Sequence, residues 1–265
     1  MTGGSAMRYE IMGPLRVMDT EGPSAIKAQK VEILLAVLLV RSDQVVALDQ
    51  LITEIWGDDP PRRAVAALYV YVSQVRKFLS RPGREDGPVL TKPPGYMLEL
   101  GTDGLDVRSF DEAVWKGREH FRTRNFEVAT RSFESALELC RGPVLDGVFR
   151  GPILQGFQTW FNEARLECIE MLMDARLALG RHRELISDLY RLGTEHPLRE
   201  PFHRQLMLAL HRSDRQADAL QVYQRARRTL NDELGLEPGR ALQEMQHAIL
   251  AADHRPVLPE HAGRP

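Results

Sequence analysis

The residues of this chain whose types and spacing suit a binding chemistry lie between Arg62 and Lys77. Apolar side chains recur there at steps of three and four, which predicts an amphipathic helix over residues 62–79 with one face against a core. The apolar positions are Val65, Leu68, Val72, Val75 and Leu79. The opposite face mixes positive charge with hydroxyl and amide groups, a combination that hydrogen-bonds to phosphates and base edges. This pattern predicts a helix that enters the major groove of double-stranded DNA.

We expect the contacts to DNA to come from this face and from a turn that follows it. The predicted set comprises Arg62, Arg63, Ala66, Tyr69, Val70, Ser73, Gln74, Arg76 and Lys77 on the helix, and Thr91 and Lys92 in the turn. The formal net charge of the chain is −2, but residues 60–95 hold seven bases and two acids. A locally positive surface on a nearly neutral chain is sufficient to attract phosphates.

Each of these assignments has a plainer alternative. Surface charges on a helix are most often only solvated, and Lys92 could be no more than an exposed turn residue. Arg76 could instead pair with an acid of the preceding helix and brace the fold. Tyr69 is a weaker contact candidate, whereas Tyr71 is expected to pack against the core with its hydroxyl in water.

The elements before this helix have their own patterns. Residues 7–19 alternate around Gly13-Pro14, which predicts two short strands and a turn. Residues 30–40 predict a buried helix, and residues 47–56 carry apolar residues spaced for one face of a helix. The run Gly-Asp-Asp-Pro-Pro at 57–61 ends the second of these helices and begins the next one.

A hairpin is predicted after the amphipathic helix. Residues 89–91 and 96–100 alternate around Lys92-Pro93-Pro94-Gly95, which places a cation at the tip. Strands, three helices and a closing hairpin in this order predict a winged helix-turn-helix over residues 7–102. In such a domain a small core holds one helix for the major groove, and a basic hairpin touches the neighbouring backbone or minor groove.

From residue 103 onward the pattern is helical and repetitive. Helix B of a tetratricopeptide unit carries a small residue, a large aromatic four positions later and a small residue three positions after that. Ala129, Phe133 and Ala136 fit this template, as do Ala219, Tyr223 and Ala226, and Leu185, Leu189 and Leu192 occupy the same places between them. Tyr223 follows Leu189 by 34 residues, the tetratricopeptide period. We therefore expect an all-α stack of helical hairpins over residues 103–252, with Gly117 allowing close packing of its first helix.

The remaining segments and several single side chains also have predicted roles. Residues 142–156 are expected to form an irregular insertion, and residues 1–6 and 253–265 a flexible N-terminus and a disordered tail. Side chains expected in the core are the three tryptophans, Trp56, Trp115 and Trp160, and two reduced cysteines, Cys140 and Cys168. Histidines expected at helix ends or surfaces are His182, His196, His203 and His211, with His196 capping its helix.

Several short motifs follow one another along the chain, and both their order and their spacing are informative. They are Leu-Ile-Thr-Glu-Ile-Trp-Gly-Asp-Asp-Pro-Pro at 51–61, Tyr-Val-Ser-Gln-Val-Arg-Lys-Phe-Leu at 71–79, Pro-Pro-Gly-Tyr at 93–96, Asp106 with Phe110, His-Pro-Leu-Arg-Glu at 196–200, Gln-Leu-Met-Leu-Ala-Leu at 205–210 and Glu-Leu-Gly-Leu-Glu-Pro at 233–238. In order and spacing they resemble the Streptomyces antibiotic regulatory protein family, in its short two-domain form. Tyr69 and Val70 depart from that family's common polar pair and Cys140 from a tryptophan, which would change sequence preference and packing respectively.

The resemblance implies a fold and a function. The fold would be mainly α, with an N-terminal OmpR-type winged helix-turn-helix with small β-sheets and a tetratricopeptide-like bacterial transcriptional activation domain. The function would be sequence-specific activation of a secondary-metabolite, or antibiotic, gene cluster. Such a regulator binds tandem direct repeats near the promoter and recruits RNA polymerase holoenzyme. We expect self-association on DNA, because one reading head covers only a few base pairs. The alternative is a ligand- or partner-sensing regulator that acts as a repressor or scaffold.

The sequence predicts a protein that is not an enzyme and uses no metal, cofactor or required small molecule. It has no Gly-x-Ser-x-Gly elbow and no glycine-rich phosphate loop, and its histidines lack the spacing and acid partner of a zinc helix. The longest apolar run, residues 33–40, is too short to span a membrane, and no secretory signal is evident. We expect a cytoplasmic protein, associated with the nucleoid when bound to DNA.

Overall fold

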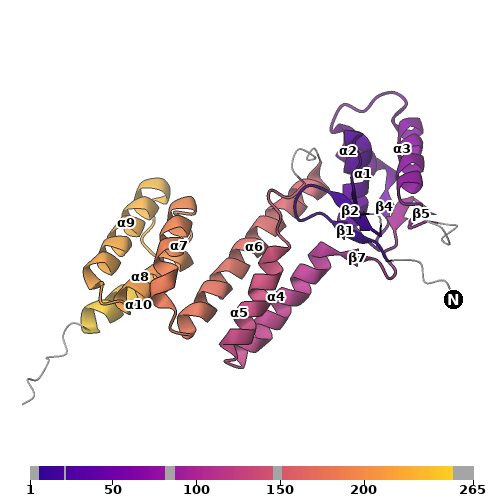
Figure 1. Ribbon diagram of the computed structural model, residues 1–265. Coiled ribbons are helices and arrows are strands. Elements are labelled where there is room, and N and C mark those ends of the chain that lie inside the picture. The colour runs from indigo at the N-terminus through magenta and orange to yellow at the C-terminus, as the bar shows by residue number, and fades with distance from the viewer. Residues whose placement is uncertain (1–5, 21, 81–86, 146–150, 253–265) are drawn as a thin grey trace, which may run out of the picture. The chain divides into compact units, whose positions relative to one another are not determined.

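The structure, a computed structural model, describes residues 6–20, 22–80, 87–145 and 151–252. The chain divides into two compact units, residues 1–117 with 131–168, and residues 118–130 with 169–265 (Figure 1). The boundary expected between residues 102 and 103 remains a prediction. The segments expected to be flexible, 1–6 and 253–265, lie outside the described residues apart from Ala6.

The first unit begins with the predicted winged helix-turn-helix. Its helices are α1 (Gln29–Val40), α2 (Leu48–Trp56) and α3 (Ala64–Phe78), which contact one another in all three pairs (Figure 1). In α1, Val31 and every residue from Ile33 to Leu39 are buried, because this uniformly apolar helix is covered on all sides. The prediction of a buried helix here is confirmed.

Two small sheets complete this part of the unit. The four-stranded sheet has the order β3-β2-β1-β7, made of β1 (Arg8–Glu10), β2 (Arg16–Asp19), β3 (Gly22–Ser24) and β7 (Gly104–Leu105). The three-stranded sheet has the order β4-β6-β5, made of β4 (Val46–Ala47), β5 (Val89–Lys92) and β6 (Gly95–Leu98). All pairings are antiparallel except β1 with β7. The predicted hairpin is therefore β5 and β6, and it gains β4 as a third strand.

Buried ion pairs and hydrogen bonds fasten the four-stranded sheet to the residues that follow it. One carboxylate oxygen of Asp106 accepts hydrogen bonds from the backbone N–H groups of Ile11 and Met12, each at 2.9 Å. The Arg141 guanidinium lies 3.7 Å from Asp106 and 3.3 Å from Glu10. Burial raises the pKa of Asp106. Burial also acts to raise the pKa of Glu10, but its arginine neighbours outweigh that effect and lower it.

The helices after the sheet are α4 (Asp106–Arg122), α5 (Phe126–Glu138) and α6 (Pro152–Ala178). Within the first unit, Phe133 is fully buried, and a Cβ added to Gly117 would stand 2.4 Å from the Phe133 ring. Only a glycine permits this approach, so the predicted close packing at Gly117 is confirmed. The irregular insertion was expected to reach residue 156, which is wrong, since α6 already begins at Pro152.

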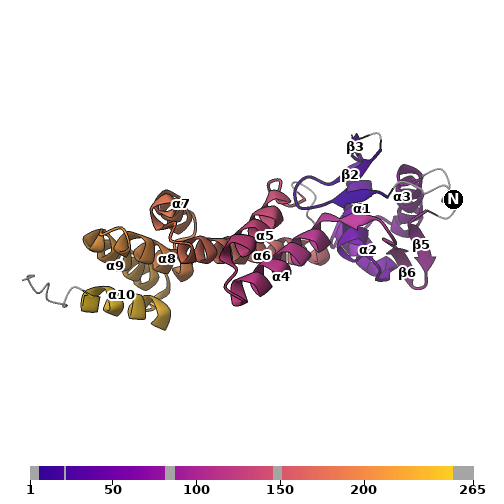
Figure 2. The same ribbon diagram turned by 60° about the horizontal axis from the view of Figure 1, so that its bottom comes forward.

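The second unit contains α7 (His182–Glu195), α8 (Glu200–His211), α9 (Gln216–Leu234) and α10 (Arg240–Ala252). Helix α8 contacts the other three and lies between α7 and α10 in Figure 2. The template positions of α7 and α9 are all buried, as predicted: Leu185, Leu189, Leu192, Ala219, Tyr223 and Ala226. His196 is the C-terminal cap of α7, which is also as predicted.

Several expectations about individual side chains are wrong. Trp115 is 62% exposed and Trp160 is 40% exposed, although both were expected in the core. Trp115 lies one position beyond the buried Val114 on α4, which turns it about 100° away from the apolar stripe. His203 was expected at a helix end or at the surface; it lies in the first turn of α8, but it is only 8% exposed. Cys168 is buried and Cys140 half-buried, and neither forms a disulfide.

Candidate nucleic-acid interface

Helix α3 turns one face to the core of the first unit and the other to solvent. Ala64, Leu68, Val72 and Val75 are buried, and Leu79 continues this face just after the helix. Val65 was predicted on this face but is 43% exposed. The smaller Ala64, one residue earlier, occupies the inward position instead. The spacing of large apolar side chains did not indicate that alanine as a core residue.

The outer face of α3 carries nearly all the residues that the sequence singled out. Exposed positions on or just before the helix are Arg62, Arg63, Ala66, Tyr69, Val70, Ser73, Gln74 and Lys77. The helix begins at Ala64 rather than at the predicted residue 62, so Arg62 and Arg63 lie in the turn before it. The structure therefore brings together an exposed surface with cations at both ends of the helix, and with both polar and apolar side chains between them.

The N-terminal end of α3 is suited to an anion. No side chain caps it, and the first N–H groups of a helix attract negative charge. A shallow hollow of about 460 Å³ opens at this end, and its lining includes Ile52, Pro60, Arg62, Arg63 and Tyr69. Two guanidinium groups beside this uncapped helix end form a place where a phosphate of a nucleic-acid backbone can be held.

Arg76 ties α3 to the hairpin. Its Nε donates to the carbonyl oxygen of Val89 at 3.0 Å and an Nη donates to Oγ1 of Thr91 at 2.8 Å. The guanidinium also lies over the ring of Tyr96, 5.7 Å from its centroid. Arg76 therefore braces the fold, which was the alternative considered for it. Its partners lie in the hairpin, however, and not on the preceding helix. Because Thr91 receives one of these bonds, both residues hold the hairpin beside α3.

The hairpin itself depends on a glycine. A Cβ added to Gly95 would stand 1.8 Å from the carbonyl oxygen of Val46, since β4 and β6 run very close at this point. Lys92, at the end of β5, is exposed next to the turn. The predicted cation at the tip of the hairpin therefore faces solvent, on a strand that Arg76 connects to α3.

Aromatic contacts fix the inner side of the interface. Tyr71 is half-buried and stacks on Trp56, with ring centroids 5.8 Å apart, so its predicted packing role is confirmed. Lys30 lies over the Trp56 ring at 5.1 Å. Tyr69, in contrast, is 51% exposed. Burial raises the pKa of Tyr96, and the nearby Tyr69 hydroxyl adds to this effect.

Sequence reasoning missed the part played by Glu54. This carboxylate is fully buried and accepts hydrogen bonds from the backbone N–H groups of Ile153, at 2.6 Å, and Leu154, at 3.3 Å. A Cβ on Gly151 would stand 2.4 Å from its carboxyl carbon. The signal available in the sequence was its position three residues after Leu51, on the apolar side of α2.

Within the described ranges, no group of three histidine, cysteine, aspartate or glutamate side chains is placed to hold a metal ion. None of the helices in that same part of the chain has the length and apolar character that a membrane span requires.

Comparison with known protein families shows the class of protein to which this chain belongs. Residues 26–98 match the family described as "Transcriptional regulatory protein, C terminal", and residues 105–250 match the "Bacterial transcriptional activator domain". Together with the winged helix-turn-helix and the exposed outer face of α3, these matches define a transcriptional regulator rather than an enzyme.

The similarity to individual proteins shows which family of transcriptional regulators the chain belongs to. The chain is 37% identical over 256 residues to the regulatory protein AfsR of Streptomyces coelicolor, covering 96% of this chain and 25% of AfsR. It is 34% identical over 254 residues to the regulatory protein DnrI of Streptomyces peucetius, covering 93% of each. The solved structure of Mycobacterium tuberculosis EmbR with a low-affinity phosphopeptide aligns with a TM-score of 0.89 at 33% identity, covering 94% of this chain and 66% of EmbR. The chain belongs to the Streptomyces antibiotic regulatory protein family.

Proposed function

We propose that this protein activates transcription by inserting α3 into the major groove of promoter DNA. The observation that carries the proposal is the outer face of α3, where eight predicted contact residues are exposed together beside the hairpin that carries Lys92. Arg62 and Arg63 at the start of the helix would hold backbone phosphates, as would Lys77 near its end. Val70 and Ser73, in the middle of the helix, would face base edges.

The wider function follows from the family. We infer that the chain binds tandem direct repeats, self-associates on them and recruits RNA polymerase holoenzyme to the promoter of a secondary-metabolite gene cluster. It would act in the cytoplasm, on the nucleoid when bound. The similarity to AfsR and DnrI supports this inference. Two linked reading heads gain affinity because the second binding step becomes intramolecular.

The DNA contact is tested by fluorescence anisotropy of the full chain on promoter duplexes over a series of salt concentrations. Arg63→Gln and Lys77→Gln should each weaken binding to every sequence and lower the salt slope by about 1, since each releases about one counterion fewer. Val70→Ala or Ser73→Ala should instead change the preferred sequence. Lys116→Gln, on α4 and in an ion pair with Glu112, is the matched control. Unchanged affinity and salt slope in both α3 variants would contradict the helix assignment.

Activation is tested by transcription in vitro with the full chain and purified holoenzyme. Templates with two direct repeats should give more transcript in the presence of the protein, and templates with one repeat should respond less. A decrease in transcript would favour repression by occlusion instead. Footprints that stay at one half-site without cooperativity would contradict self-association.

A further inference from the structure

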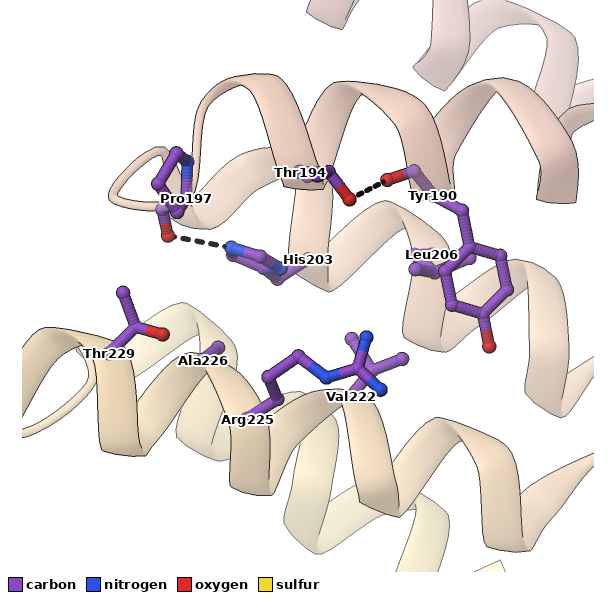
Figure 3. Close-up of a pocket in the computed structure, with 10 residues that line it drawn as sticks. Tyr190, Thr194, Pro197, His203, Leu206, Val222, Arg225, Ala226 and Thr229 are labelled. Carbon is purple, nitrogen blue, oxygen red and sulfur yellow. Dashed lines mark hydrogen bonds between the residues drawn. The ribbon is translucent and has the colours of Figure 1, made fainter.

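The second unit contains a pocket that the proposed DNA contact does not use. Its volume is about 290 Å³, near the lower end of the range for small-molecule sites. Figure 3 shows it between three helices, α7, α8 and α9. The lining residues used below are Gly193, His203, Leu206, Val222 and Arg225. None of them belongs to the first unit, so the pocket and the DNA-contacting face are separate sites.

Most of the pocket wall is apolar. Leu206 and Val222 are buried and present aliphatic surface from two different helices, and Ala226 and Pro197 extend it. A concave apolar wall with a few convergent polar groups is the usual form of a site for a small organic ligand. The polar groups therefore decide which ligand fits.

The first polar group is the His203 imidazole, which Figure 3 shows in the middle of the pocket. Its Nε2 lies 2.8 Å from the carbonyl oxygen of Pro197. A carbonyl only accepts hydrogen bonds, so Nε2 carries the proton and donates. Burial lowers the pKa of His203, and the positive charge of Arg225 adds to the effect while Glu200 and the Pro197 carbonyl oppose it. The shift favours the neutral ring, and in the neutral ring with the proton on Nε2 the Nδ1 atom is an acceptor.

Space beside this acceptor depends on Gly193. A Cβ on Gly193 would stand 3.3 Å from both Nδ1 and Cε1 of His203, closer than an ordinary contact. Glycine at this position therefore leaves more room beside the ring edge that bears Nδ1 than a residue with a side chain would. A ligand with an N–H or O–H group can therefore donate to it.

The second polar group is the Arg225 guanidinium. Arg225 is exposed on α9, and Figure 3 shows its side chain lying along this helix, with the guanidinium beside Val222 at the pocket. No carboxylate of the described part of the chain forms an ion pair with it. A guanidinium at the rim of an apolar pocket favours an anion, and a carboxylate matches its planar pair of donors best.

We propose that this pocket binds a small organic acid whose carboxylate pairs with Arg225 and whose neighbouring N–H or O–H donates to Nδ1 of His203. An apolar group of the same molecule would lie on Leu206 and Val222. N-acyl amino acids and hydroxy acids with an aliphatic side chain have all three features. The C-terminus of a peptide shares this chemistry, but the small volume favours a free small molecule.

The test uses the full-length protein and N-acetyl-L-leucine as the probe. Binding is measured by calorimetry, and the side-chain ¹⁵N resonances of His203 are followed by NMR. Saturable binding should shift the Nδ1 resonance, because this atom gains a hydrogen bond. N-acetyl-L-leucine amide, which lacks the carboxylate, should bind at least about tenfold more weakly, as expected for the loss of a charge-assisted hydrogen bond.

Variants locate the site. Arg225→Gln should weaken binding of N-acetyl-L-leucine about tenfold or more, whereas Arg228→Gln, one turn further along the exposed side of α9, should leave it unchanged. Gly193→Ala should weaken binding by crowding Nδ1, with the fold checked by circular dichroism. Affinity for promoter DNA without the probe should be the same in Arg225→Gln as in the unmodified protein, so failure here is separate from failure of the DNA assignment.

The opposite results would overturn the proposal. These are no saturable binding, equal binding of the acid and the amide, an equal loss in Arg225→Gln and Arg228→Gln, or a His203 resonance that does not move at saturation. A tetrapeptide ending in leucine forms the second arm. If the tetrapeptide binds more weakly than N-acetyl-L-leucine, the result supports a small-molecule site. If it binds equally or more tightly, the result contradicts such a site.

Discussion

The carboxylate of Glu54, on the second helix of the winged domain, accepts a hydrogen bond from the backbone N–H of Ile153 at a distance of 2.6 Å. Ile153 lies in the first turn of α6, so Glu54 caps that helix from outside it and meets its positive end. The contact joins residues 99 positions apart and is wholly buried at the carboxylate. The DNA-contacting part of the first unit is thereby fastened to a helix of the activator region.

Removing this cap should destabilise the first unit. Glu54→Ala leaves two buried N–H donors without an acceptor, and we expect a loss of about 2–4 kcal/mol in the free energy of unfolding. Glu54→Gln keeps one acceptor and should lose less. Denaturant unfolding followed by fluorescence measures both, with Asp49→Asn on the exposed side of the same helix as control. A loss in Asp49→Asn equal to that in Glu54→Ala would contradict the assigned role.

The same residue predicts a pH dependence. Burial raises the pKa of Glu54 above its unfolded value, with the two backbone hydrogen bonds opposing the shift. The folded state therefore binds the proton more tightly, so the stability linked to Glu54 is fully present below its unfolded pKa, about 4.3, and is lost as pH rises through the folded pKa. The advantage of the unmodified protein over Glu54→Gln should be largest near pH 4 and should shrink toward pH 7. A constant difference over this range in paired unfolding curves would show that Glu54 does not titrate in this way.

Arg76 should act on DNA through the hairpin. Arg76→Gln removes the bonds to Val89 and Thr91, which should cost about 1–2 kcal/mol of stability and loosen β5 against α3. Because Lys92 is then held less firmly, affinity for DNA should fall on all sequences. Lys77→Gln is the comparison, since it should lower affinity with no change in the melting temperature. Faster amide exchange in residues 89–92 of Arg76→Gln, and not of Lys77→Gln, would identify a positioning residue, and identical exchange would refute it.

Gly95 should tolerate no side chain. The Val46 carbonyl that a Cβ would meet at 1.8 Å is backbone and cannot move without breaking the pairing of β4 with β6. Gly95→Ala should therefore cost at least about 3 kcal/mol. Gly101→Ala is the control: its φ is +55° and no atom lies within 4 Å of the added Cβ, so only the backbone cost of about 1 kcal/mol applies. Similar melting temperatures for the two variants would contradict the steric argument.

Periodicity was sufficient for the long elements and for the outer face of α3. Three helices and the hairpin were predicted because each repeats its apolar residues over two or more turns or alternations. Strands β3, β4 and β7 were not, since two or three residues are too few to show alternation and each is defined by a partner elsewhere in the chain. Helix boundaries differed by one or two residues for a similar reason.

Buried polar side chains were harder to predict from the sequence than apolar helix faces. Glu54 and His203 are types that usually lie at the surface, and what buries them is a partner distant in the sequence: the N-terminus of α6 for Glu54, and the Pro197 carbonyl with α9 for His203. Spacing within one helix cannot reveal such partners. It does show which face a residue is on, and Glu54 shares the inner face of α2 with Leu51 and Ile55.

Gly117 and Phe133 should show a measurable coupling, because the sequence template and the structure agree on their contact. A Cβ on Gly117 would overlap the Phe133 ring at 2.4 to 2.8 Å, so Gly117→Ala should cost about 1–3 kcal/mol although alanine favours the helix by about 1 kcal/mol. Phe133→Ala removes the ring atoms Cδ1, Cε1 and Cζ, which are the ones that would clash. In that background Gly117→Ala should be neutral or stabilising, giving an interaction free energy of at least about 1 kcal/mol in a double-mutant cycle of denaturant unfolding. Additive single and double variants would mean that α4 and α5 shift apart to accommodate the methyl group, and that glycine is not what sets their separation.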